Sequence, residues 1–193
     1  FLGSSDNWRQ IAKLFFSDYN VHLIDLRNHG NSFHDPVHNY EVMSNDVIEY
    51  IKDKKLNNSI LIGHSMGGKV ALEIASKIED LSHLVIVDIA PRDYIGDHQD
   101  VLNALKQANL LECNTITECD KELSVYIKEL AIRQFLIKNI KRKENKKFEW
   151  KINTNYILDN YKNILKKPYL KDYIEIPTLF IKGENSNYIN DDD

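Results

Sequence analysis

A candidate nucleophile lies in the run Gly63-His64-Ser65-Met66-Gly67, which has the pattern G-x-S-x-G. An apolar run at 59–63 precedes the pattern, and a helical pattern at 66–78 follows it. A sharp turn from strand to helix would raise the Ser65 hydroxyl above the carboxyl edge of a sheet, where open α/β folds bind ligands. Such a turn requires small residues on either side of the serine so that the chain can pass, and we expect this to be the reason for Gly63 and Gly67. Ser65 is therefore predicted to attack an acyl carbonyl.

The start of the helix after Ser65 supplies partial positive charge and free N–H groups. The N–H of Met66 is predicted to point at the oxyanion that develops during acyl transfer. Gly68 is predicted to allow close packing of this helix on the sheet.

A serine nucleophile needs a base and an acid that orients the base. The acid candidates follow strand-like runs: Asp88 in Val87-Asp88-Ile89 and Glu184 in Gly183-Glu184-Asn185. The expected order in the chain is serine, acid and histidine. All seven histidines precede the last predicted strand, so we expect the catalytic histidine to lie beyond Asp193. His64, His29 and His98 are weaker candidates for the base.

The elements that would position these residues alternate between strand and helix, which is typical of a parallel α/β sheet. The short apolar runs are typical of strands buried on both faces. Strands are predicted at 21–26, 59–63, 84–89 and 178–183, and helices at 6–17, 40–54 and 66–78, with Asp6 as the N-cap of the first helix.

The stretch between the last two predicted strands is too long for one crossover helix. We expect a helical insertion at 96–170, with the sheet domain formed by 1–95 and 171–193. A lysine-rich run at 138–151 within the insertion is interpreted as a solvated helix face or loop.

Composition excludes several classes of protein. Of 193 residues, 42% are hydrophobic and 28% charged, which is typical of a globular domain. The net charge of −4 argues against nucleic acid as the main partner. No apolar run approaches the roughly 18–20 residues that a membrane-spanning helix needs. Cys113 and Cys119 form no Cys-x-x-Cys motif, so we expect a reducing compartment and no zinc site.

The first residue is Phe1 rather than methionine, and the sequence stops in a polar run soon after a strand-like segment. We expect residues 1–193 to be a piece of a longer chain, and we expect this piece to lack the first strands and the catalytic histidine. Residues 1–193 alone are then expected to be inactive.

Four ordered motifs resemble those of the α/β-hydrolase superfamily, and more narrowly those of YbfF-type small serine esterases and their mitochondrial relatives. The motifs are 1–8 (FLGSSDNW), 25–32 (DLRNHGNS), 63–69 (GHSMGGK) and 87–94 (VDIAPRDY). The corner at 183–186 is also similar, whereas 96–170 matches only in position and helical character.

The resemblance implies an α/β-hydrolase fold: a mostly parallel sheet with helices on both faces and a helical lid at 96–170 that shapes the acyl pocket. It implies that Phe1 occupies the position of the second oxyanion donor. Ser186 falls at the usual position of the acid, so the resemblance favours Asp88 as the acid, with Glu184 as the alternative. It implies no metal and no organic cofactor, and a cytoplasmic or mitochondrial location.

The sequence thus predicts a serine hydrolase that cleaves carboxylic esters through an acyl-enzyme on Ser65, acting on small acyl esters or thioesters as an esterase, an acyl thioesterase or a lipase-like enzyme. The alternative is a ligand-binding scaffold or receptor on the same fold that performs no catalysis. The oligomeric state and the acyl chain length are not predicted.

Overall fold

The computed structural model describes residues 1–190 and 192–193, which form two compact units. The first unit comprises Phe1, 37–95 and 160–193, and the second comprises 2–36 and 96–159. These boundaries differ from the predicted division into 1–95 with 171–193 and 96–170, because 2–36 groups with most of the insertion. The role of 96–170 as a lid stays a prediction.

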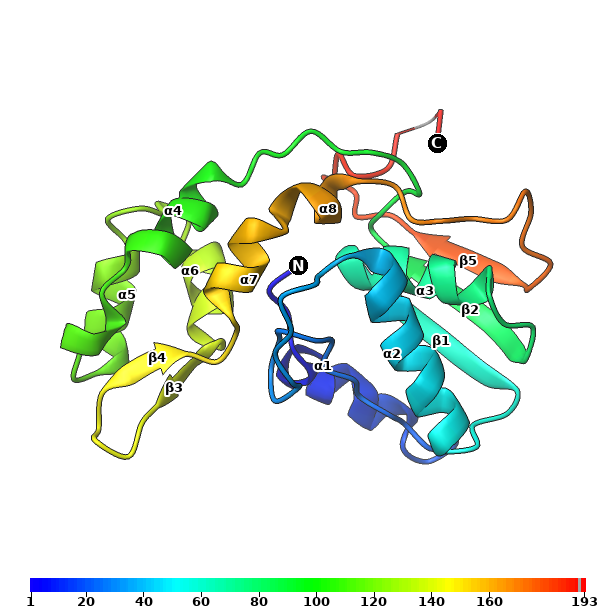
Figure 1. The fold of residues 1–193 in the computed structure, drawn as a ribbon, viewed down its shortest axis with the longest axis horizontal. Helices are drawn as coiled ribbons and strands as arrows, with labels where there is room; N and C mark the ends of the chain where they lie inside the picture. The colour runs from blue at the N-terminus through cyan, green and yellow to red at the C-terminus, as the bar shows by residue number, and fades with distance from the viewer. Residues whose placement is uncertain (191) are drawn as a thin grey trace. The chain divides into compact units, whose positions relative to one another are not determined.

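A three-stranded parallel sheet forms the centre of the first unit, in the order β1-β2-β5 (Figure 1). The strands are β1 (Ser59–His64), β2 (Leu81–Val87) and β5 (Thr178–Ile181). The helices of this unit are α2 (Tyr40–Asp53), α3 (Met66–Ala75) and α8 (Tyr161–Leu165). The predicted strands at 59–63, 84–89 and 178–183 and the helices at 40–54 and 66–78 are confirmed within a few residues.

Helix α2 begins where the sequence offers a cap. The Asn39 side chain accepts a hydrogen bond of 3.0 Å from the N–H of Val42, which satisfies one of the free donors of the first turn. The apolar positions of α2 then recur at helical spacing, and Met43, Val47 and Ile51 are buried. This face packs against α3.

Helix α3 packs on β1 and β2 and covers one face of the sheet, where Leu84 and Ile86 are fully buried. The other face of β1 is different, because Ile60 and Ile62 are 41% and 44% exposed. The expectation that this strand is buried on both faces is therefore wrong for the described residues. Since successive side chains of a strand point to opposite faces, a single covering helix buries only every second residue.

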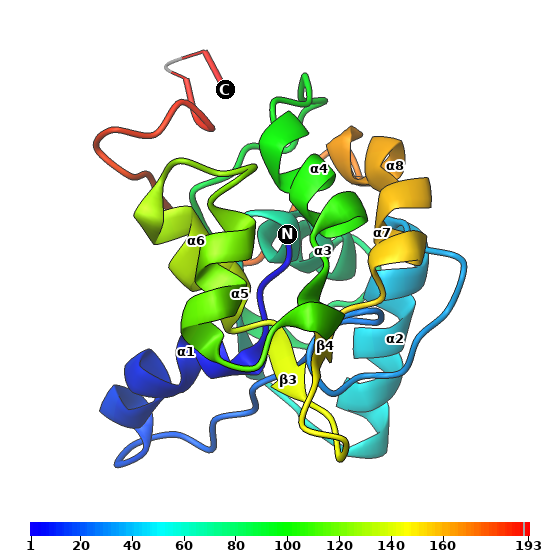
Figure 2. The same cartoon turned by 90° about the vertical axis from the view of Figure 1, so that its left-hand side faces the viewer.

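The second unit is mostly helical and also contains a short hairpin (Figure 2). Within it α5 packs against α6, and α4 packs against α7. Its elements are α1 (Ser5–Ala12), η1 (Lys13–Phe15), α4 (Gln99–Gln107), η2 (Leu110–Glu112), α5 (Ile116–Leu123), α6 (Leu130–Ile137), β3 (Ile140–Arg142), β4 (Phe148–Trp150) and α7 (Thr154–Asp159).

Three local predictions in the second unit are wrong. The N-cap of α1 is Ser4 rather than Asp6, and the Ser4 N–H donates to the Asn7 side chain at 2.8 Å. Residues 21–26 form no strand, because among the described residues they have no partner in a ladder. In the lysine-rich run at 138–151 the helix alternative is wrong, because the run forms the antiparallel hairpin β3-β4. Ile140 and Phe148 are buried there, whereas Lys141, Lys143 and Lys146 are exposed as expected of a solvated segment.

In the part of the chain that the structure describes, no helix has the length and apolar character needed to cross a membrane.

Candidate active site

Ser65 occupies the turn between β1 and α3, as the sequence predicts. Its backbone has φ +51° and ψ −121°, a conformation that residues other than glycine rarely adopt. The neighbouring chain fixes this turn: the Ser65 N–H donates to the carbonyl of Val87 at 2.9 Å, and the Ser65 carbonyl accepts from the N–H of Gly68 at 2.8 Å. Such strain, on the order of 1–3 kcal/mol, persists only where the surrounding structure imposes it, and it is typical of active sites.

The glycines that make room for the turn are not all those predicted. A Cβ atom on Gly63 would lie 2.3 Å from the carbonyl oxygen of Gly67, and one on Gly68 would lie 2.6 Å from the Ile89 side chain. A Cβ on Gly67, in contrast, would meet nothing within 4 Å. The steric requirement expected for Gly63 is confirmed, whereas the one expected for Gly67 is wrong. The expected close packing of Gly68 on the sheet is confirmed, because a Cβ there would also lie 3.3 Å from the Ile86 side chain of β2.

Asp88 lies beside the serine turn in the sheet. The residues that precede Ser65 and Asp88, His64 and Val87, are paired in the ladder between β1 and β2. Adjacent strands are about 4.8 Å apart, so both candidate residues leave the same carboxyl edge of the sheet side by side. Asp88 also has a positive φ, of +55°.

Two hydrogen bonds to the segment around β5 hold Asp88. Its N–H donates to the carbonyl of Ile181 at 2.7 Å, and its carboxylate Oδ1 accepts from the N–H of Gly183 at 3.0 Å. The second bond fixes one carboxylate oxygen, so the side chain is already oriented. Glu184, the alternative acid, is exposed in the corner at 183–186, which is closed by a 3.0 Å bond from the Ser186 N–H to the Gly183 carbonyl.

The candidate oxyanion donors belong to the same compact unit as Ser65. Met66 is the first residue of α3, where a backbone N–H has no partner within the helix. The positive end of the helix dipole adds to its ability to bind an anion. The Phe1 ring packs on the ring of Tyr161, with centroids 5.8 Å apart.

His64 lies directly before the nucleophile, at the end of β1. Partial burial lowers its pKa from the ordinary value, and the Asp88 carboxylate opposes this shift.

His29 and His98, the other candidates for the base, belong to the second unit. His29 is buried, and both of its ring nitrogens bond the backbone: Nε2 with the N–H of Leu2 at 3.3 Å, and Nδ1 with the carbonyl of Arg27 at 2.9 Å. These bonds give the ring a structural role in holding the N-terminal segment. His98 lies directly before α4.

The sequence prediction gave no role to Lys69, which lies one turn after the nucleophile in α3 and is fully buried. A signal was present in the sequence: Lys69 and Glu73 are the charged residues of the otherwise apolar run at 66–75. Charged groups at such positions are rarely buried unless they have partners.

The comparisons with known proteins agree with this geometry. The family model described as "alpha/beta hydrolase fold" matches residues 1–193. The chain therefore belongs to the α/β-hydrolase family, which confirms the predicted fold class.

Three relatives and one solved structure make the similarity more specific. The chain is 38% identical over 189 residues to a protein of Haemophilus influenzae named "Putative esterase/lipase", covering 97% of this chain and 64% of the relative. It is 31% identical to "Esterase YbfF" of Escherichia coli, covering 98% and 73%. It is 35% identical to "sn-1-specific diacylglycerol lipase ABHD11" of Danio rerio, covering 99% and 63%. The predicted resemblance to YbfF-type esterases is confirmed.

Among solved structures, a "Marine microorganism esterase" has a TM-score of 0.95 at 40% identity, covering all of this chain and 77% of the other. The chain spans 64%, 73% and 63% of the lengths of these three curated relatives, in the order given above.

Proposed function

We propose that this chain carries the nucleophile and the acid of a serine hydrolase that cleaves carboxylic esters. The strained turn at Ser65 carries the proposal, because it places the serine at the carboxyl edge of the sheet beside the oriented carboxylate of Asp88. The names of the relatives, which include esterases and a diacylglycerol lipase, support the same class of reaction.

In the proposed reaction, the Ser65 Oγ forms a bond to the ester carbonyl carbon while a histidine takes its proton. The carbonyl oxygen becomes an oxyanion, which the N–H groups of Met66 and Phe1 stabilise. The bond to the alkoxy group then breaks, and the histidine gives its proton to the leaving alcohol. Water, activated by the same histidine, releases the acid from Ser65. Asp88 orients the histidine.

The substrate class is a small acyl ester or an acyl thioester, and segment 96–170 is proposed to cover the acyl group as a lid. No cofactor takes part in these steps. The alternative function, ligand binding without turnover, would use the same fold without acylation of Ser65.

The test uses the full-length protein and a fluorophosphonate probe, which forms an O–P bond to an activated serine and releases fluoride. We expect labelling of Ser65 together with hydrolysis of p-nitrophenyl esters. The Ser65→Ala variant should lose labelling and lower kcat by several orders of magnitude, up to about a million-fold. A folded wild-type protein that is neither labelled nor active would favour the binding function.

Matched substitutions decide between the two acids. Asp88→Asn keeps the shape of the side chain but removes its charge, and should lower kcat by about 10²- to 10⁴-fold. Glu184→Gln, at the exposed corner, should change kcat less than threefold. The reverse order would assign the acid to Glu184. Replacing each histidine by glutamine in the same assay would identify the base.

A further inference from the structure

The ammonium group of Lys69 lies inside the first compact unit, where its side chain is 1% exposed. Its Nζ lies 4.5 Å from the centroid of the Tyr94 ring and 5.4 Å from that of Tyr40, so two aromatic faces enclose the charge. Nζ also donates to the carbonyls of Lys166, at 2.7 Å, and Leu165, at 3.4 Å. Lys69 thus connects the helix that follows Ser65 to the end of α8.

The last carbonyls of α8 have no partner within the helix, and the C-terminal end of a helix favours a cation. Here other parts of the unit supply the donors. The Tyr40 hydroxyl donates to the carbonyl of Ile164, and the Tyr94 N–H donates to that of Leu165 at 2.8 Å. Together with the bonds from Lys69, three successive carbonyls at 164–166 are bound.

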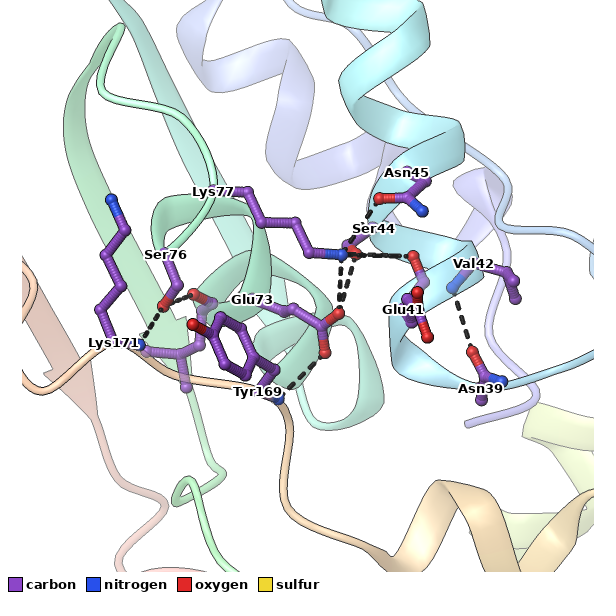
Figure 3. Close-up of polar contacts among 11 residues, drawn as sticks. Asn39, Glu41, Val42, Ser44, Asn45, Glu73, Ser76, Lys77, Tyr169 and Lys171 are labelled. Atoms are coloured by element: carbon purple, nitrogen blue, oxygen red, sulfur yellow. Dashed lines mark hydrogen bonds and ion pairs between the residues drawn. The ribbon is translucent and has the colours of Figure 1, made fainter.

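The same face of α3 holds the chain that continues from α8. Lys69 and Glu73 of α3 and Ser76, the C-cap of this helix, are spaced i, i+4 and i+7 and therefore lie on one face. The Glu73 carboxylate accepts from the Tyr169 N–H at 3.1 Å, and the Ser76 hydroxyl accepts from the Lys171 N–H at 3.3 Å (Figure 3). The three polar side chains of this face thus bind the backbone of 165–171 in order along the chain.

The other end of α8 reaches the proposed oxyanion site. Tyr161, the first residue of α8, packs on the ring of Phe1. Because α8 has only five residues, we expect a shift at Leu165 to displace Tyr161 as well. The position of Phe1 therefore depends on how the end of α8 is held.

Lys69 is not a favourable residue for stability alone. Burial lowers its pKa from 10.5 to about 8, Asp93 opposes this shift and Arg92 adds to it. A buried ion of this kind can often be replaced by an apolar residue without loss of stability. A role in positioning explains why the helix nevertheless carries a charge here.

We propose that Lys69 is a positioning residue for the oxyanion site: by fixing the end of α8 to the helix that follows Ser65, it sets the place of Tyr161 and through it that of Phe1. This inference rests on the proposed function, because it assigns Phe1 as an oxyanion donor. Lys69 acts on the transition state through α8 and does not touch the substrate.

The experiment compares two lysine-to-methionine substitutions in the full-length protein, one in α3 and one just after the end of α3. Lys69→Met should lower kcat for p-nitrophenyl esters by about 10- to 100-fold, since a displacement near 1 Å has an effect of this size. KM should change less than threefold, because the oxyanion donors act on the transition state. Lys77→Met is the matched control: Lys77 bonds Glu73 and Ser44 but does not hold α8, so kcat should stay within threefold.

A conservative variant of Lys69 and a double variant with Tyr161 distinguish a positioning role from a general loss of structure. Lys69→Arg keeps a charge that can bind carbonyls and stack on aromatic rings, so it should recover at least half of the lost activity on a logarithmic scale. Tyr161→Ala should lower kcat as Lys69→Met does, and the double variant should be no worse than the more impaired single variant. Should Lys69→Met fail to fold, Tyr40→Phe, which loses only the bond to Ile164, should lower kcat several-fold.

Unchanged kcat in folded Lys69→Met, or independent multiplicative losses in the double variant, would overturn the inference. A wild-type protein without fluorophosphonate labelling would instead overturn the proposed function. The two failures are therefore distinguishable.

Discussion

Replacing Gly63 by alanine tests whether the geometry of the serine turn controls activity. The added Cβ would lie 2.3 Å from the Gly67 carbonyl oxygen, 2.6 Å from the Gly67 carbonyl carbon and 2.7 Å from the Gly68 Cα. Ordinary contacts begin near 3.4 Å, so the first turn of α3 must move by about 1 Å. All three atoms belong to the backbone, so no side-chain rotation can relieve the clash.

This displacement acts on both parts of the proposed chemistry, because Ser65 and the Met66 N–H move with the turn. A shift of about 1 Å near a reaction centre costs on the order of 100-fold in rate. Overpacking of a close-packed site also destabilises, by about 1–3 kcal/mol. We therefore expect Gly63→Ala to lower kcat by about 100-fold and to lower the free energy of unfolding by a few kcal/mol.

The assay measures ester turnover, the rate of fluorophosphonate labelling and urea unfolding in the full-length protein. Gly67→Ala is the companion variant, since its Cβ would meet nothing within 4 Å. It should reduce turnover less than tenfold and be neutral or up to about 1 kcal/mol stabilising, because alanine favours a helix over glycine. Wild-type turnover in Gly63→Ala, or a larger loss in Gly67→Ala than in Gly63→Ala, would refute the steric reasoning.

Further predictions concern buried groups outside the serine turn. Burial lowers the folded-state pKa of Lys69 to about 8, so between about pH 8 and 10 the unfolded chain binds more protons than the folded chain. The free energy of unfolding should therefore rise with pH in this range, by up to about 3 kcal/mol more in wild type than in Lys69→Met. Equal pH dependence of the two proteins in urea unfolding would contradict this. Burial raises the pKa of both free thiols, that of Cys119 to about 12, so Cys113 and Cys119 should react with iodoacetamide at pH 8 at least tenfold more slowly in the native protein than in urea. Glu73→Gln removes the buried carboxylate that pairs with the Lys77 ammonium, so it should lower the free energy of unfolding by about 1–3 kcal/mol. An unchanged midpoint of urea unfolding would show that the amide satisfies the same partners.

Local sequence patterns determined the elements that carry the candidate site. The strand before Ser65, the turn and the helix after it follow from a short apolar run, the G-x-S-x-G spacing and a helical period, all within 59–78. The ends of β2 and β5 were predictable for the same reason, and with them the positions of Asp88 and Glu184. Each of these signals depends on neighbours in the chain, so a single sequence contains them.

Other features depend on contacts between distant segments, and only the tertiary structure decided them. Residues 21–26 have the composition of a strand, but a strand exists only when another strand pairs with it. The run at 138–151 is rich in lysine, yet the pairing of Ile140 with Trp150 makes it a hairpin. Space at a glycine is set by whatever packs against it, which is why Gly68 is tight and Gly67 is not.

The position of Lys69 shows the difference most clearly. The sequence determined that a lysine lies four residues after the nucleophile on the same helix. Only the fold brings the carbonyls of 165–166, almost one hundred residues later, to that lysine and satisfies its charge. Burial of a charge is decided by the partners that the rest of the chain provides, and those partners have no signature in the local sequence.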